Sequence, residues 1–293
     1  DGIRDSVASR GLGDVYKRQD ACLATLRAVP GGGNVVHHTI VVDALARAGR
    51  GDAALALYAA AAFKENARSR HARLRALTQA ARDATLAGDA ERARGHSRAA
   101  EAVAAECGDA RGFQTAVACC REARDWEALL RVYDAHAASA HLDAPDGLAR
   151  TAALQACRLA RHGARRAHEL WHAWRRDADG GMTRDRPDAF AYSAYAAAFA
   201  PRGGLDLDDA RRLLRDAERH GVLRPRGFNG TGRVDRRAEQ NQMNLLASLL
   251  EGCAARGGVG DALVLVDDME AVSYTHLRAH ETLRYLVCRL LLE

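Results

Sequence analysis

The clearest chemical pattern is His168-Glu169-Leu170-Trp171-His172, which matches the zinc-binding motif HExxH. On a helix this spacing places two histidines one turn apart as metal ligands, with the glutamate available as a general base. A third ligand is missing, because no Gly-x-x-His continues the motif. The helical period also predicts that Trp171 and Trp174 face the core and that both histidines lie at the solvated edge. We therefore predict no metal site and keep His168 and His172 only as a weak candidate for a zinc hydrolase.

Other reactive residue types do not form a catalytic pattern. Cys119 and Cys120 are adjacent, but no base is tied to them, and Cys120 is expected to be buried as a small apolar side chain. The segment Gly227–Gly232 lacks the Gly-Lys-Ser/Thr ending of a phosphate-binding loop. Seven cysteines without a CxxC pair argue against a disulfide framework and a thiolate zinc site, and favour a reducing compartment. We predict a protein that is not an enzyme, with no catalytic residues and no cofactor.

The element that repeats along the chain is a pair of short helices, clearest in Phe113–Tyr133. Apolar residues recur three and four positions apart on both sides of a break at Arg124-Asp125, so each helix has one apolar face. Two helices of about a dozen residues cannot bury such faces alone and need neighbouring pairs. The pair therefore predicts an array.

Further segments follow the same plan, each with a break between two amphipathic helices. With Arg124, the breaks fall at Gly49, Gly88, Arg161, Gly203 and Gly257. The first four breaks are spaced by roughly 35 to 40 residues, which is typical of an α-solenoid. The two longer intervals contain insertions at Asp177–Arg186 and Gly227–Gln240. The sequence predicts an all-α fold of about six helix-turn-helix repeats, near residues 35–73, 74–109, 110–146, 147–188, 189–226 and 243–272.

The composition agrees with closely packed helices. Hydrophobic residues make up 48% of the chain but aromatic residues only 5%, so alanine and leucine must fill the core. Alanine is depleted in strands, which disfavours a sheet. The net charge of +5 is mildly basic, and nearly every cation is arginine. Arginine suits phosphate contacts and stacking on bases, although a GC-rich genome explains the bias equally well.

The two ends differ from the rest of the chain in composition and in the periodicity of their apolar residues. Residues 1–19 show no helical or strand period, and residues 273–293 break the Ala/Arg/Asp-rich composition. Both resemble translated library-adapter sequence; the alternative is a divergent tail at each end. We exclude them and expect residues 20–272 to form the fold, with any targeting segment outside the sequence. The apolar run LVCRLLL is far shorter than the roughly 20 residues of a spanning helix, and we predict no membrane partner.

Several repeats resemble the pentatricopeptide repeat. The matching segments are VVDALARAGRGDAALALY, LQACRLARHGARRAHELW, PDAFAYSAYAAAF and LLEGCAARGGVGDALVLVDDM. Cys120, Cys157 and Cys253 occupy the same place in three repeats, and Pro145-Asp146 and Pro187-Asp188 close two of them. This resemblance, over about four-fifths of the chain, implies a right-handed α-solenoid that binds single-stranded RNA, one base per repeat. It also implies a role in RNA processing, stability or translation in the mitochondrion or plastid (chloroplast).

The family reads bases with the fifth residue of a repeat and with its closing residue. Carried over, these RNA-binding residues are Thr39, Thr78, Gln114, Thr151 and Ser193, with Ala247 in the last repeat and Asp146 and Asp188 as closing residues. Thr151 with Asp188 is the one full pair of the usual type and implies a purine. Gln114 and Ala247 depart from the family pattern. For the Thr and Ser residues, the structural alternative is that they cap their helices.

A protein-binding solenoid of the tetratricopeptide type is the main alternative, because the second repeat fits that unit as well. Such a scaffold would bind a peptide on the same face. An RNA reader should line this face with arginine and the Thr, Ser and Asp residues named above, whereas a peptide binder should show apolar pockets or a carboxylate clamp. Neither interpretation implies a small-molecule substrate.

Overall fold

The computed structural model is helical throughout the part of the chain that it describes. It describes Ala24, Leu26 and residues 33–61, 63–160, 163–181, 185–199, 204–223 and 236–271, and no strand occurs among them. The predicted all-α class is confirmed. The adapter-like ends, the predicted breaks at Arg161 and Gly203, and the segment Gly227–Gly232 lie outside the described residues.

The chain divides into two compact units, Asp1–Pro145 and Asp146–Glu293. The described helices of the first unit are α2 (Val35–Arg47), α3 (Gly51–Ala60), α4 (Ala67–Leu86), α5 (Ala90–Cys107), α6 (Ala110–Glu122) and α7 (Trp126–Ala137). Those of the second are α8 (Gly147–Leu159), α9 (Gly163–Asp179), α10 (Ala189–Ala197), α11 (Leu207–Arg219) and α12 (Arg236–Ala271).

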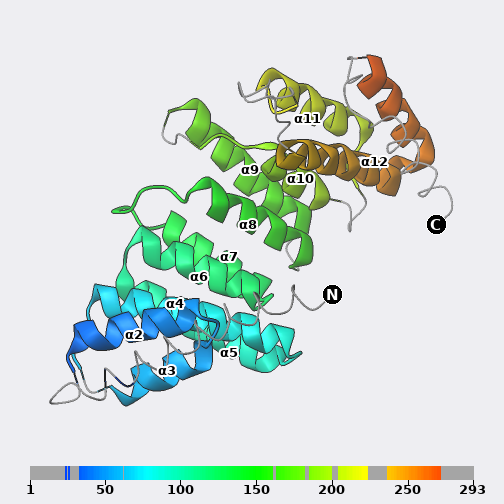
Figure 1. The fold of residues 1–293 in the computed structure, drawn as a ribbon. Coiled ribbons are helices and arrows are strands. Elements are labelled where there is room, and N and C mark those ends of the chain that lie inside the picture. Colours follow the sequence, from blue (N-terminus) through cyan, green and yellow to red (C-terminus); the bar gives the residue numbers. More distant parts are fainter. Residues whose placement is uncertain are drawn as a thin grey trace. The chain divides into compact units, whose positions relative to one another are not determined.

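Both units are built from helical hairpins whose first helices pack on one another. In the first unit the hairpins are α2/α3, α4/α5 and α6/α7, and α4 lies between α2 and α6 (Figure 1). In the second unit α8/α9 and α10/α11 form hairpins, and α10 packs on both α8 and α12. Gly258, next to the predicted break at Gly257, has a φ of 74° and divides α12 into two helical parts. The first helices therefore occupy equivalent places within each unit.

The turns of the first three hairpins share one backbone conformation. Gly49, Gly88 and Arg124 have φ angles of 78°, 79° and 52°, in the left-handed region. In each turn the N–H after this residue donates to a carbonyl five residues earlier, as in the Schellman motif. These bonds run from Arg50 to Leu45, from Asp89 to Ala84 and from Asp125 to Cys120, at 3.0, 2.9 and 2.9 Å. The three predicted break positions are thus confirmed in detail.

The second hairpin begins earlier than predicted. Its first helix, α4, starts at Ala67 rather than near residue 74. The reason is a capping box at Asn66, whose side chain accepts the Ser69 N–H at 2.9 Å while the Ser69 hydroxyl accepts the Asn66 N–H at 3.0 Å. This pair satisfies two N–H groups that a helix start would otherwise leave unpaired.

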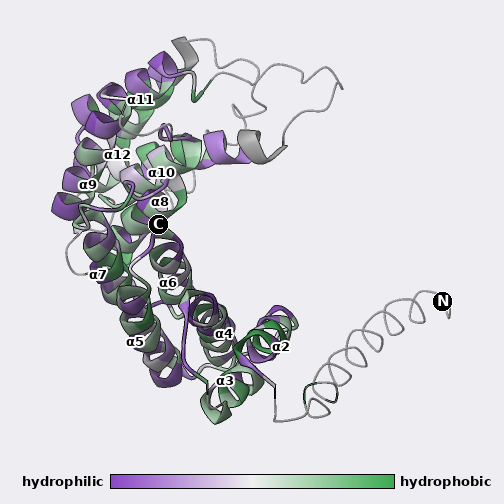
Figure 2. Ribbon diagram, turned by 90° about the vertical axis from the view of Figure 1, so that its left-hand side faces the viewer, coloured by the Kyte–Doolittle hydropathy of each residue, from purple (hydrophilic) through white to green (hydrophobic). Residues whose placement is uncertain are grey.

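Small apolar side chains fill the cores, as the composition predicts. Ala72, Ala80, Ala100, Ala116 and Ala128 are fully buried in the first unit. The larger core residues of that unit include Leu45, Leu74 and Leu129, all nearly inaccessible to solvent. In Figure 2 the apolar residues of the hairpins lie toward neighbouring helices, and hydrophilic residues lie on their outer sides. No described helix is both long and apolar enough to span a membrane.

Arg124 supplies the first testable prediction. It is the one non-glycine residue with positive φ in the described part of the chain, and its side chain is exposed. An L-residue with a side chain is strained in this region by about 1–2 kcal/mol. Arg124→Gly is therefore expected to raise the free energy of unfolding of the first unit by about 1 kcal/mol in urea titrations. The control Arg121→Gly, in the last turn of α6, should lower it by up to about 1 kcal/mol. A loss of stability in Arg124→Gly would contradict the strain argument.

Candidate functional site

The six residues carried over as fifth positions all lie on first helices, each ten residues before the break that the sequence predicts for its hairpin. Thr39 is on α2, Thr78 on α4, Gln114 on α6, Thr151 on α8, Ser193 on α10 and Ala247 on α12. These residues therefore occupy equivalent positions on their own helices. Their surroundings, however, differ from one helix to the next.

Three threonine hydroxyls are bound to their own helices. Those of Thr39, Thr78 and Thr151 donate to the carbonyl four residues earlier, at 2.6, 2.8 and 2.7 Å. Thr39 and Thr151 are also buried. None of the three caps its helix, so the capping alternative is wrong for them. The N-caps of their helices α2, α4 and α8 are instead Asn34, Asn66 and Asp146.

Ser193 and the two closing aspartates have structural partners. The Ser193 hydroxyl lies 3.0 Å from that of Ser248, so Ser193 is buried where α10 packs on α12. Asp146 and Asp188 are the N-caps of α8 and α10, accepting the N–H groups of Ala149 at 2.8 Å and Ala191 at 2.9 Å. Within the described residues no hydrogen bond joins Thr151 to Asp188.

Exposed polar groups gather on the neighbouring helices α4 and α6 of the first unit. Gln114 is exposed on α6, one turn after the exposed Arg111. On α4, the half-buried Thr78 lies between Arg75 and the exposed Arg82, each about one turn away. We call these five residues the α4–α6 strip. Arg75 is held by an ion pair with Asp43 of α2. The strip combines arginines with groups that can hydrogen-bond a base edge.

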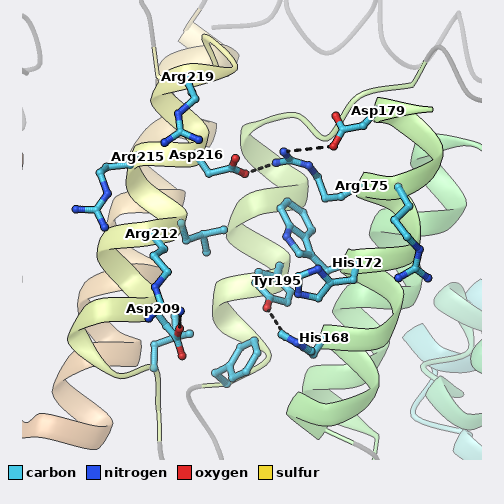
Figure 3. A pocket seen from close by; sticks show the side chains of 15 residues that line it. His168, His172, Arg175, Asp179, Tyr195, Asp209, Arg212, Arg215, Asp216 and Arg219 are labelled. Atoms are coloured by element: carbon cyan, nitrogen blue, oxygen red, sulfur yellow. Dashed lines mark hydrogen bonds and ion pairs between the residues drawn. The ribbon is translucent and has the colours of Figure 1, made fainter. Parts of the chain in front are cut away.

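A cavity in the second unit lies between α9, α10 and α11. Its volume is about 640 Å³. Figure 3 shows its wall on α9, with His168, His172 and Arg175, facing Arg212 and Asp216 on α11. Tyr195 of α10 lies between these two walls.

An ion-pair network crosses this cavity. Arg175 pairs with Asp216 and donates to the Tyr192 hydroxyl at 2.9 Å and to His220 Nε2 at 2.8 Å. The Tyr192 hydroxyl donates to Asp216 at 2.7 Å. Burial, and then the nearby Asp216 carboxylate, raise the pKa of Tyr192 well above its usual value, so this hydroxyl keeps its proton. The network ties α9 to α11 through α10.

The two histidines of the HExxH motif lie together beneath this network. Their ring centroids are 4.2 Å apart, and His168 Nδ1 is 3.0 Å from the Tyr195 hydroxyl. Partial desolvation of its ring, followed by the charges of His168 and Arg176, lowers the pKa of His172. Both histidines are exposed and both tryptophans, Trp171 and Trp174, are buried, as predicted.

Among the described residues, the rest of a zinc hydrolase site does not assemble around these histidines. Glu169 pairs instead with Arg166 at 3.0 Å and Arg165 at 3.3 Å. The hydrogen bond from Arg166 is the largest cause of the lowered pKa of Glu169. In the described part of the chain, no three His, Cys, Asp or Glu side chains are placed to hold a metal ion. Cys119 and Cys120 are fully buried, and burial raises the pKa of the Cys119 thiol to about 12.

The cavity was not predicted from the sequence, although the spacing of the charged residues on α11 indicates a charged helix face. Arg215, Asp216 and Arg219 follow Arg212 by three, four and seven residues and therefore share one face of α11. Such a charged face is usually only a solvated surface. Which helix it faces depends on packing between distant segments.

No protein-family model matches this chain, and no curated protein is significantly similar to it.

Proposed function

We propose that this chain is a helical-repeat protein that binds single-stranded RNA, each unit being a segment of a right-handed α-solenoid of the pentatricopeptide type. The supporting observation is the α4–α6 strip. Arg75 and Arg111 lie at the same distance before the turn residues Gly88 and Arg124, and so do Thr78 and Gln114. Packed first helices thus present the same kinds of side chain at regular spacing.

This arrangement matches the needs of an extended RNA strand. Successive unstacked bases can each meet one first helix, where a hydroxyl or amide hydrogen-bonds the base edge. Nearby guanidinium groups can contact phosphates or stack on bases. The hydroxyls of Thr39, Thr78 and Thr151 all donate to their own helices, and Thr39 and Thr151 are also buried. The main contact is therefore assigned to the exposed Arg111 and Gln114 of the strip. The family resemblance adds an organellar role in RNA processing, stability or translation.

A binding assay with the full chain tests this proposal. A labelled pool of single-stranded RNA is titrated at several salt concentrations, with double-stranded RNA of matched length as competitor. We expect selective single-strand binding that weakens as salt increases, because phosphate contacts release counterions. The double variant Arg111→Ala/Gln114→Ala should bind about tenfold or more weakly and show a smaller salt slope.

The matched control is Arg94→Ala, which removes an exposed arginine from the second helix α5. It should bind RNA within about twofold of the unchanged chain. If a folded, helical chain does not bind single-stranded RNA, or if Arg94→Ala weakens binding as much as the double variant, the proposal is wrong. The first result would favour the tetratricopeptide-like scaffold that binds a peptide.

A further inference from the structure

The cavity between α9, α10 and α11 takes no part in the RNA contact proposed above, because the α4–α6 strip belongs to the other unit. Five arginines and three aspartates line it. Arg175 is paired with Asp216, and Arg212 lies 3.4 Å from Asp209. Arg176 and Arg219 form no ion pair with any described residue, and both are exposed at the rim. The rim therefore carries uncompensated positive charge, which attracts an anion.

The floor of the cavity is aromatic and apolar. Tyr195 stacks on the buried Trp171, with ring centroids 4.7 Å apart and an angle of 13° between the planes. Phe199 meets Tyr195 edge-on at 5.1 Å and is half-buried. Leu205 and Leu213 complete the lining. Rigid rings of this kind can pack against the face of a planar ligand group.

We propose that this cavity binds a nucleoside phosphate. The base would pack against the floor at Tyr195 and Phe199, and the phosphates would contact Arg212 and Arg219 of α11 (Figure 3). Guanidinium groups suit phosphate because their planar donors match its oxygens. The volume of about 640 Å³ lies within the range of small-molecule sites.

Two features favour a small ligand over a passing RNA strand. The cavity is an open pocket bounded by three helices, and its apolar floor and its arginines line the same space. A single molecule with a flat ring at one end and phosphates at the other satisfies both. In Figure 3 the Arg175–Asp216 pair crosses the cavity at a level between Arg212 and Arg219 of α11.

The test is isothermal titration of the full chain with ATP, pyrophosphate and adenosine, without added Mg²⁺. ATP is expected to bind at least tenfold more tightly than either of the other two, because only ATP fills both halves of the cavity. Arg212→Ala/Arg219→Ala should weaken ATP binding at least tenfold. Phe199→Ala should weaken ATP binding but leave pyrophosphate binding unchanged. The control Arg158→Ala removes an exposed arginine of α8 outside the cavity and should leave ATP binding unchanged.

Circular dichroism and urea unfolding first establish that each variant is folded; a variant that is not folded is replaced by Arg212→Gln/Arg219→Gln. Three results would overturn the proposal: no ATP binding by the folded chain, equal affinity for ATP and pyrophosphate, or unchanged ATP binding in the folded arginine variant. If that variant instead loses RNA affinity by the same factor as ATP affinity, the cavity belongs to the RNA path. The strip variant Arg111→Ala/Gln114→Ala should keep its ATP affinity, so the two proposals fail independently.

Discussion

Replacing Gly204 with alanine is expected to lower the free energy of unfolding of the Asp146–Glu293 unit by roughly 3 kcal/mol or more. Two effects combine at this position. Gly204 has a φ of 73°, which strains any residue with a Cβ. A Cβ would also clash with the carbonyl oxygen of Gly252 on α12 and lie only 2.7 Å from Arg256 N. Both neighbours are backbone atoms, so they cannot move aside without displacing the helix.

Two other glycines separate these effects. Gly88 has a φ of 79° but nothing within 4 Å of the added Cβ, so Gly88→Ala should cost only about 1–2 kcal/mol. Gly51 has no positive φ, but its Cβ would lie 2.7 Å from Ala80 Cα on α4, so Gly51→Ala should cost about 1–3 kcal/mol through overpacking.

Hydrogen exchange of peptides from each unit, measured in increasing urea, reports these losses separately for the two units. Gly204→Ala should show the largest loss of the three variants. If Gly204→Ala costs no more than Gly88→Ala, then α12 does not approach the turn as closely as the structure shows.

Removing the carboxylate of Asp177 should destabilise the same unit by about 3–5 kcal/mol. Its partner Arg150 is only 3% exposed, and Arg150 Nη2 lies 2.7 Å from Asp177 Oδ2. The guanidinium also lies over the Trp174 ring, 5.8 Å from its centroid. Asp177→Ala leaves a buried positive charge without this carboxylate, whose attraction offsets the cost of removing the guanidinium from water.

A double variant distinguishes a charge effect from a loss of packing. Arg150→Met/Asp177→Leu removes both charges and should recover most of the stability lost in Asp177→Ala, as measured by urea unfolding of the second unit. The exposed pair of Arg165 and Glu169 is the control, and Glu169→Ala should change stability by less than about 1 kcal/mol. An equal loss in Asp177→Ala and in the double variant would show that packing, rather than the loss of the Arg150–Asp177 charge pair, dominates.

The sequence by itself determined the helical class and the turns of the first three hairpins. Each depends on local chemistry: apolar residues three and four apart, and glycine where the backbone needs positive φ. The buried positions of Trp171, Trp174 and Cys120 followed from the same periodicity. The turn at Arg124 was also located from the break in the apolar pattern, although arginine is a poor residue for a positive φ. Neighbouring helices fix the backbone there.

Only the tertiary structure decided which of the predicted polar residues reach solvent. Thr39 and Gln114 occupy equivalent positions on their helices, yet Thr39 is buried and Gln114 is exposed. The cavity on α9 and α11 and the Arg150–Asp177 pair likewise join residues 27 or more positions apart. Periodicity assigns a side chain to one face of its own helix. What that face meets is set by how the hairpins pack, which depends on side-chain volumes and backbone contacts such as that of Gly204 with Gly252.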